Sequence, residues 1–221
     1  EFRRVLFRSR NTRSSLERFG YKFPERNFLE PELEMPNSML AIKVALDAYL
    51  TSAYGAVEEL LSPEGKGVSR GFVSSIYEQR FASSLSAIRA SILRRKDRLE
   101  SLFFSRSYEY AFDFDEDDFL DDENEVVDLS SSEPNILDTV TDSLRSAIQN
   151  EVNYLEDVLK LVDSVALGPI EGDPKLVSAK ELIISKSGTD DKTIVFSRYT
   201  DTLNALVQTI ERDSRFSGIP Y

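Results

Sequence analysis

DKTIVFSRYTDTLNALVQTIER, residues 191–212, joins two hydrophobic patterns in one segment. Ile194, Val195 and Phe196 form an uninterrupted apolar run, which is typical of a strand buried on both faces. From Leu203 to Ile210 the apolar side chains recur three and four residues apart, which predicts an amphipathic helix. A strand followed by a helix begins a parallel α/β unit, because parallel strands need a crossover connection. We therefore predict a partial α/β unit, with residues 192–197 exposed because its neighbouring strands are missing from this sequence.

Upstream of this unit the periodicity predicts three long helices, over residues 37–61, 70–103 and 135–164. The apolar stripes expected to face a core are Leu40, Val44, Tyr49 or Leu50, and Val57 in the first; Val73, Ile76, Tyr77, Phe81, Leu85, Ile88 and Ile92 in the second; and Leu137, Val140, Leu144, Ile148, Val152, Leu155, Leu159 and Val162 in the third. The spacing of the third stripe is that of a coiled-coil seam. We expect the second and third helices to pair as an antiparallel hairpin.

Glycine and proline residues mark the remaining helix boundaries. Gly168-Pro169 ends the third helix, and Asp173-Pro174 begins another with proline in its first turn. The fold class is therefore mainly α with a partial α/β unit. The expected segments are an irregular link at 10–36, a helical region at 37–107, an acidic tract at 108–133, a long helix at 134–168 and the start of an α/β lobe at 173–221.

The negative charge is concentrated in one segment. Of the 39 acidic residues, twelve lie within residues 108–133, which contain no Lys or Arg. Removing those twelve leaves 27 acidic residues against 27 basic ones, so the net charge of −12 does not argue against a DNA-binding face elsewhere. Such a block of like charges is typical of a disordered tract, and we expect it at the tip of the hairpin.

Composition excludes several kinds of chemistry. The chain has no Cys and no His, which excludes disulfides, thiolate or imidazole metal sites and triads built on histidine. Gly65-Lys66-Gly67 lacks the frame of a phosphate loop, so we assign no catalytic or metal-binding residues. The sequence contains no signal peptide and no apolar run of membrane-spanning length, which predicts a cytoplasmic protein without a membrane partner.

Residues 1–9, EFRRVLFRS, match the translation of a common sequencing-adapter end, GAG TTC AGA CGT GTG CTC TTC CGA TCT. We expect these residues to be an adapter scar and leave them out of the fold. The alternative is a native basic strand.

Three groups of residues together resemble bacterial Swi/Snf-type DNA translocases, a branch of the superfamily-two helicases. In that family an Asp-x-Lys segment begins a helix, and a strand ending in Phe-Ser then precedes another helix. The matching residues are Asp173, Lys175, Phe196, Ser197, Asp201 and Thr202. Residues 79–84, QRFASS, resemble part of the family's helical region, and Arg10–Arg13 with Phe23–Arg26 resemble the link that leaves the first lobe.

The resemblance implies an internal fragment of such a motor: the end of the link from lobe one, a helical hairpin insertion, and the beginning of a second RecA-like lobe. It implies that the intact protein hydrolyses ATP with magnesium and moves along double-stranded DNA. The ATP-binding motifs of the family are missing from this sequence, so we expect the fragment alone to be inactive and to need no cofactor.

Candidate DNA contacts fall into two groups. Arg80, Arg94 and Arg95 lie in one predicted helix and are suited to phosphate contacts. The alternative is a solvated helix, with Arg80 paired to a core acid. In the second group, Ser197, Arg198 and Thr200 stand at the start of the last helix, where hydroxyls and free N–H groups bind phosphate. For the two hydroxyl residues the alternative is simple helix capping.

The sequence is also consistent with a second function, of a different class from the translocase. The coiled-coil-like hairpin is also suited to protein partners, which would make the chain a non-enzymatic helical adaptor. A partial α/β unit favours the translocase, since an adaptor has no need of it.

Overall fold

Of the 221 residues, the computed structural model describes residues 13–23, 28, 30–61, 70–104, 142–166, 172–186 and 192–217. The chain divides into two units, Glu1–Leu33 and Glu34–Tyr221. In the first unit, α1 spans Arg13–Arg18 and is followed by a turn at Gly20, whose φ of 87° suits glycine. This helix corrects the prediction that residues 10–36 are irregular throughout. The prolines that favoured that prediction all follow the helix.

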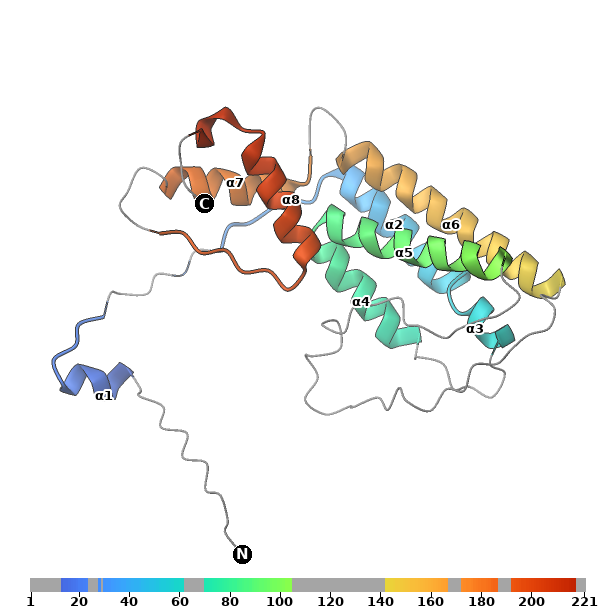
Figure 1. Cartoon of the computed structure of the whole chain (residues 1–221), viewed down its shortest axis with the longest axis horizontal. Coiled ribbons are helices and arrows are strands. Elements are labelled where there is room, and N and C mark those ends of the chain that lie inside the picture. The colour runs from blue at the N-terminus through green and yellow to red at the C-terminus, as the bar shows by residue number, and fades with distance from the viewer. Residues whose placement is uncertain are drawn as a thin grey trace, which may run out of the picture. The chain divides into compact units, whose positions relative to one another are not determined.

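The second unit is built from helices (Figure 1). They are α2 (Asn37–Ser52), α3 (Ala56–Leu61), α4 (Arg70–Ser83), α5 (Leu85–Phe104), α6 (Asp142–Ala166), α7 (Pro174–Lys186), α8 (Thr200–Glu211) and the short 3-10 helix η3 (Ser214–Phe216). The longest, α6, packs against α2, α3 and α5, while α8 packs against α5 and α7. The described residues contain helices and no strand, so the prediction of a mainly helical chain is confirmed.

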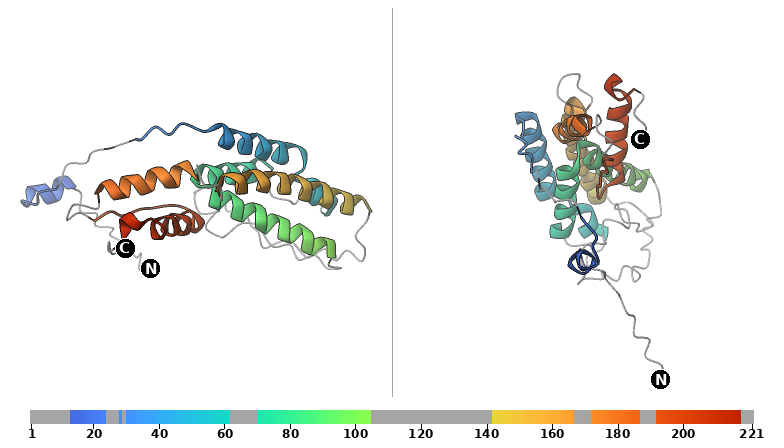
Figure 2. Two further views of the ribbon diagram at one scale, coloured as in Figure 1. Left: turned by 90° about the horizontal axis from the view of Figure 1, so that it is seen from above. Right: turned by 90° about the vertical axis from the view of Figure 1, so that its left-hand side faces the viewer.

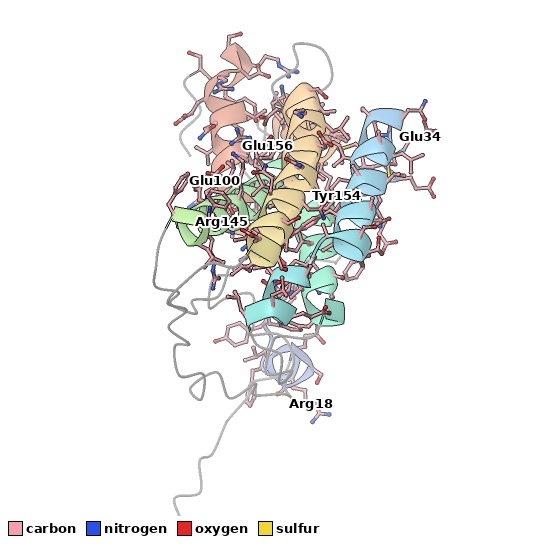
Figure 3. All side chains as sticks on the ribbon, turned by 90° about the vertical axis from the view of Figure 1, so that its right-hand side faces the viewer. Arg18, Glu34, Glu100, Arg145, Tyr154 and Glu156 are labelled. Carbon is pink, nitrogen blue, oxygen red and sulfur yellow. The ribbon has the colours of Figure 1, made fainter. Side chains whose placement is uncertain are left out.

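The predicted antiparallel hairpin is formed by α5 and α6. Arg89 at the start of α5 pairs with Asp163 near the end of α6, and the Arg145 guanidinium near the start of α6 lies over the Phe103 ring at the end of α5. Between them, Lys96 contacts Glu156 on α6 and Glu100 on its own helix. Figure 3 labels Arg145, Glu156 and Glu100 on the two helices. The predicted stripe from Leu144 to Val162 is buried, as its period requires.

The first predicted helix is wrong in its length and in part of its buried face. Residues 37–61 form two helices, α2 and α3, separated by a turn at Gly55, whose φ is 92°. Leu40 and Val44 are 51% and 61% exposed. The predicted burial of Tyr49, Leu50 and Val57 is confirmed, and the other buried side chains of α2 are Met39, Ile42 and Leu46. Apolar residues occupy two faces of this helix, so periodicity alone did not distinguish the face that packs.

The second predicted helix is interrupted at Ser84, between α4 and α5. The Ser84 hydroxyl accepts a hydrogen bond from the main-chain N–H of Ala87 at 3.0 Å, which makes it the N-cap of α5. The predicted apolar stripe from Val73 to Ile92 is nevertheless buried on both sides of the break. Figure 1 shows the two helices meeting at an angle where α8 also begins, and Figure 2 gives two further views of the chain.

The C-terminal elements have a small apolar core of their own. It consists of Leu176, Leu206, Ile210 and Phe216, from α7, α8 and η3. Residues 192–197 have no regular secondary structure, so the predicted strand is not formed in the described part of the chain. A strand needs a neighbour to satisfy its main-chain groups. Ile194 and Phe196 are 73% and 89% exposed, which confirms the expected exposure of this segment.

Several predictions concern residues outside the described ranges. They are the adapter-like residues 1–9, the acidic tract 108–133, the first residues of the predicted helix 135–164, and the last four residues of the chain. Within the described ranges, no helix combines the length and the apolar character that a membrane span requires.

Candidate functional site

Four helix ends meet at one place in the second unit. The C-terminal end of α4 lies there with the N-terminal ends of α5, α7 and α8. We call this place the helix joint and define it by residues 79–85, 173–175 and 198–202. Three helix N-termini bring the positive ends of their dipoles to the joint, and its side chains include both carboxylates and guanidinium groups.

Arg80 is the central cation of the helix joint. Its side chain is 2% exposed, and Nη1 lies 3.2 Å from Oδ2 of Asp201 in the first turn of α8. The guanidinium carbon also lies 4.6 Å from the ring centre of Tyr199. Both charges suit their helices, because a cation near the C-terminus of α4 and an anion near the N-terminus of α8 oppose the local dipoles. Arg80 therefore joins the end of one helix to the beginning of another.

Hydroxyl groups make a second link beside this ion pair. The Thr202 hydroxyl lies 2.8 Å from the hydroxyl of Ser83 and 2.8 Å from that of Ser84. Since Ser84 also caps α5, the first turns of α5 and α8 are connected through two side chains.

Asp173 caps two helices with one carboxylate. Oδ1 accepts a hydrogen bond from the main-chain N–H of Lys175 at 2.9 Å, within α7, and Oδ2 accepts one from the main-chain N–H of Leu85 at 2.6 Å, in α5. The Lys175 ammonium in turn donates to the main-chain carbonyl of Ala82 at the end of α4. The prediction that Asp173 begins a helix is confirmed, and its second contact is a tertiary feature.

The second group of predicted DNA contacts lies at the edge of the helix joint. Arg198 is exposed and donates to Oε1 of Gln79 at 2.6 Å, and Thr200 is the exposed first residue of α8. The N-cap of α8 is Tyr199, whose side chain makes no capping bond. The half-buried Ser197 hydroxyl accepts from the main-chain N–H of Tyr199 at 3.3 Å, so it supports the turn before the helix.

The structure separates the three arginines of the first group. Nη1 of Arg94 lies 4.0 Å from Asp201 Oδ2, so Arg94 and Arg80 approach the same carboxylate oxygen. Arg95 contacts α3 and α6 instead. Arg80, Arg94 and Arg198 are therefore brought to one joint, whereas Arg95 belongs to the bundle core.

Arg95 is held by two carboxylates. Its Nε and Nη2 donate to Glu151 at 2.8 and 3.0 Å, and Nη2 lies 2.6 Å from Glu58. The Tyr49 hydroxyl also donates to Glu151 at 3.0 Å. Burial raises the pKa of Glu151 while Arg95 opposes that rise, and burial raises the pKa of Tyr49 well above its usual value. The guanidinium of Arg95 is thereby engaged in a buried structural network.

Sequence reasoning missed the acidic partners of these arginines. Glu58 and Glu151 carry no local signal that distinguishes them from surface acids on a helix, although Glu151 lies beside the buried position Val152. The contact between the Arg80 guanidinium and the buried Tyr199 ring was likewise not predicted. Among the residues of the helix joint, the dipeptide Asp173-Pro174 was the local sequence signal that predicted a helix start.

The exposed edge of the helix joint carries the N-terminus of α8 and the guanidinium of Arg198, groups whose chemistry suits an anion. Within the described residues, no group of three acidic side chains is arranged to hold a metal ion. Comparison with models of protein families, with curated proteins and with solved structures finds no match.

Proposed function

We propose that this chain is part of a Swi/Snf-type ATP-dependent DNA translocase, contributing a helical region and the first elements of a second RecA-like lobe. The observation that carries the proposal is the convergence of three motif segments. Residues 79–84, 173–175 and 197–202 each resemble that family, and all three contribute contacts to the helix joint.

Four of the six matched residues, Asp173, Lys175, Asp201 and Thr202, contact the QRFASS segment or the residue after it, whereas Phe196 is 89% exposed. Asp201 binds Arg80, and Thr202 binds both serines of the QRFASS segment. Asp173 binds Leu85, the residue that follows this segment, from 88 positions away. Residues 173–175 and 197–202 belong to one family pattern and QRFASS to a second, and two fortuitous matches would have no reason to lie together in the fold. Their assembly at one place supports a common structural origin.

DNA binding is assigned to the exposed edge of the helix joint. Arg198 and Thr200 are exposed at the N-terminus of α8, where main-chain N–H groups and a guanidinium suit a phosphate, and Ser197 stands beside them. Arg94, which is partly exposed, is assigned as a flanking contact. Arg80 and Arg95 are committed to buried ion pairs, so the proposal gives them structural roles. ATP and magnesium belong to the intact motor, and no residue of this chain is assigned to them.

The predicted strand that would favour the translocase over an adaptor is not formed in residues 192–197, so the adaptor alternative is weighed on its partner surface. Its partner surface was the coiled-coil-like hairpin, and the described part of the stripe on its third helix is buried against α5 and α2 within the chain. A buried seam is not available to another protein. Packing within the chain's own core therefore explains the apolar stripe of the third helix.

The test is duplex DNA binding by the full chain, measured by fluorescence anisotropy of a labelled duplex over a series of salt concentrations. We expect nonspecific affinity on the order of 10–100 μM, weakening linearly with the logarithm of salt. Arg198→Ala should reduce the slope by about one, since one phosphate contact is lost.

The control is Lys160→Ala, which removes an exposed cation on α6 away from the helix joint. It should leave the slope unchanged. Absence of salt-dependent duplex binding, or equal effects of the two substitutions, would remove the DNA assignment.

A further inference from the structure

Arg80 has the contacts of a residue that orients another element. It is the largest fully buried side chain of the described residues by volume, although arginine is rarely buried unless it is paired. It comes from the last turn of α4, and its partner Asp201 lies in the first turn of α8, 121 residues away. The ion pair therefore connects the bundle to the C-terminal elements.

The two regions that Arg80 connects have separate apolar cores. The bundle core includes Tyr77 and Phe81 of α4, one on each side of Arg80 in sequence, while the core of α7, α8 and η3 is centred on Leu206 and Ile210. Hydrogen bonds and ion pairs of the helix joint link the two regions, from Arg80, Ser83 and Ser84 to α8 and from Asp173 to α5. Arg94 of α5 adds an ion pair with Asp201. Polar contacts depend on direction more than apolar packing does, so they fix an orientation.

The N-terminus of α8 has little local support of its own. Tyr199 at the N-cap makes no side-chain capping bond, and the preceding residues 192–197 have no regular secondary structure. Asp201, with its side chain 32% exposed, pairs with Arg80 at 3.2 Å and with Arg94 at 4.0 Å. The Arg80 guanidinium also lies over the ring of Tyr199. The first turn of α8 is thus held by contacts from the end of α4 and from α5.

We propose that Arg80 is a positioning residue: through Asp201 and Tyr199 it holds the first turn of α8 against the bundle and so aims Arg198 and Thr200 at the phosphate they bind. The contacts alone support the role of Arg80 in holding α8. Its role in orienting Arg198 and Thr200 toward a phosphate rests on the proposed function. Arg80 itself does not touch the phosphate.

Hydrogen exchange in the full chain tests the first step. We expect Arg80→Ala to speed exchange of the α8 amides by about tenfold or more, the loss expected for a hydrogen bond between charged groups, while the amides of α6 keep their rates. Asp201→Asn, which is nearly isosteric and removes the partner charge, should act in the same direction. Arg80→Lys should restore part of the protection, because it keeps the charge and loses the planar guanidinium.

The matched control is Arg89→Ala, which breaks an ion pair between α5 and α6 that does not involve α8. It should leave α8 exchange unchanged. Unchanged α8 exchange in both Arg80→Ala and Asp201→Asn would overturn the proposal. Equal acceleration in α6 and α8 would also overturn it, because Arg80 would then act only on global stability.

DNA binding by the same variants tests the second step. Arg80→Ala should weaken duplex binding without changing its salt slope, whereas Arg198→Ala should lower the slope by about one. A lowered slope for Arg80→Ala would identify a phosphate contact and overturn the positioning role. If the unmodified chain binds no duplex, the proposed function fails, and the exchange result still decides whether Arg80 holds α8.

Discussion

Asp173 Oδ2 lies 2.6 Å from the main-chain nitrogen of Leu85, so the residue that caps α7 also caps α5. One carboxylate thus satisfies N–H groups at the starts of two helices that are distant in sequence. Both helices begin at the helix joint, and the Asp173 side chain determines how they approach each other.

Asp173→Ala should lower the free energy of unfolding by about 2 kcal/mol, because single caps contribute roughly 0.5–2 kcal/mol and two are lost. Asp173→Asn, which keeps one oxygen acceptor, should cost less. Urea denaturation followed by circular dichroism measures both. Asp157→Ala, on an exposed pair with Lys160, serves as the control and should change stability by less than about 1 kcal/mol. A similar effect of Asp173→Ala and Asp157→Ala would refute the double cap.

Arg95→Ala should be far more destabilising than Arg89→Ala. Removing Arg95 leaves the carboxylates of Glu58 and Glu151 without their shared guanidinium, and breaking a buried pair in this way costs about 3–5 kcal/mol. Arg89 and Asp163 are partly exposed, so their pair is worth about 1 kcal/mol or less. Thermal unfolding of the two variants makes the comparison. Similar melting temperatures would show that the Arg95 network contributes little.

Glu151 should make stability fall as pH rises above its unfolded-state pKa. Burial raises the pKa of Glu151 in the folded state above its ordinary value of 4.5, against the opposing effect of Arg95. The folded state therefore binds more protons than the unfolded state between 4.5 and the raised pKa, and its relative stability decreases as pH rises through that window.

Glu151→Gln isolates this contribution, because glutamine does not titrate. The free energy of unfolding of the unmodified chain, minus that of the variant, should decrease with rising pH across the window. Urea titrations at several pH values provide the measurement. An increase with pH would mean that the attraction of Arg95 outweighs burial.

Ser197→Ala combined with Thr200→Ala should weaken duplex DNA binding by about 1–2 kcal/mol, the loss of one or two hydrogen bonds to a charged acceptor. The loss should be nearly equal for duplexes of different sequence, since phosphate contacts carry no base information. Ser101→Ala with Thr51→Ala is a matched control, because those hydroxyls bond to carbonyls of their own helices. Unchanged affinity together with a lower melting temperature would reduce Ser197 and Thr200 to structural roles.

The chain alone should release no phosphate from ATP, with or without duplex DNA. The proposed motor needs a phosphate-binding loop and an acid that holds magnesium, and neither motif is present in this sequence. A steady-state phosphate-release assay is the measurement. DNA-stimulated turnover would contradict the assignment of this chain to the helical region and the second lobe.

Much of the helical fold was predictable because its signals are local. The stripe from Leu144 to Val162 and the one from Val73 to Ile92 repeat with the helical period and are buried as expected. Asp173-Pro174 likewise marked the start of α7. Prediction was wrong where local signals competed: α2 carries apolar residues on two faces, and Leu40 and Val44 are on the exposed one.

The sequence by itself determined the helical character of the chain, most of its buried stripes and the segments worth testing for function. Only the tertiary structure decided that Arg80 binds Asp201, that Arg95 binds Glu151, and that Asp173 reaches Leu85. These partners are separated by 121, 56 and 88 residues. Helical periodicity reports which face of a segment is apolar, but the partner of a buried charge depends on how whole helices pack against one another.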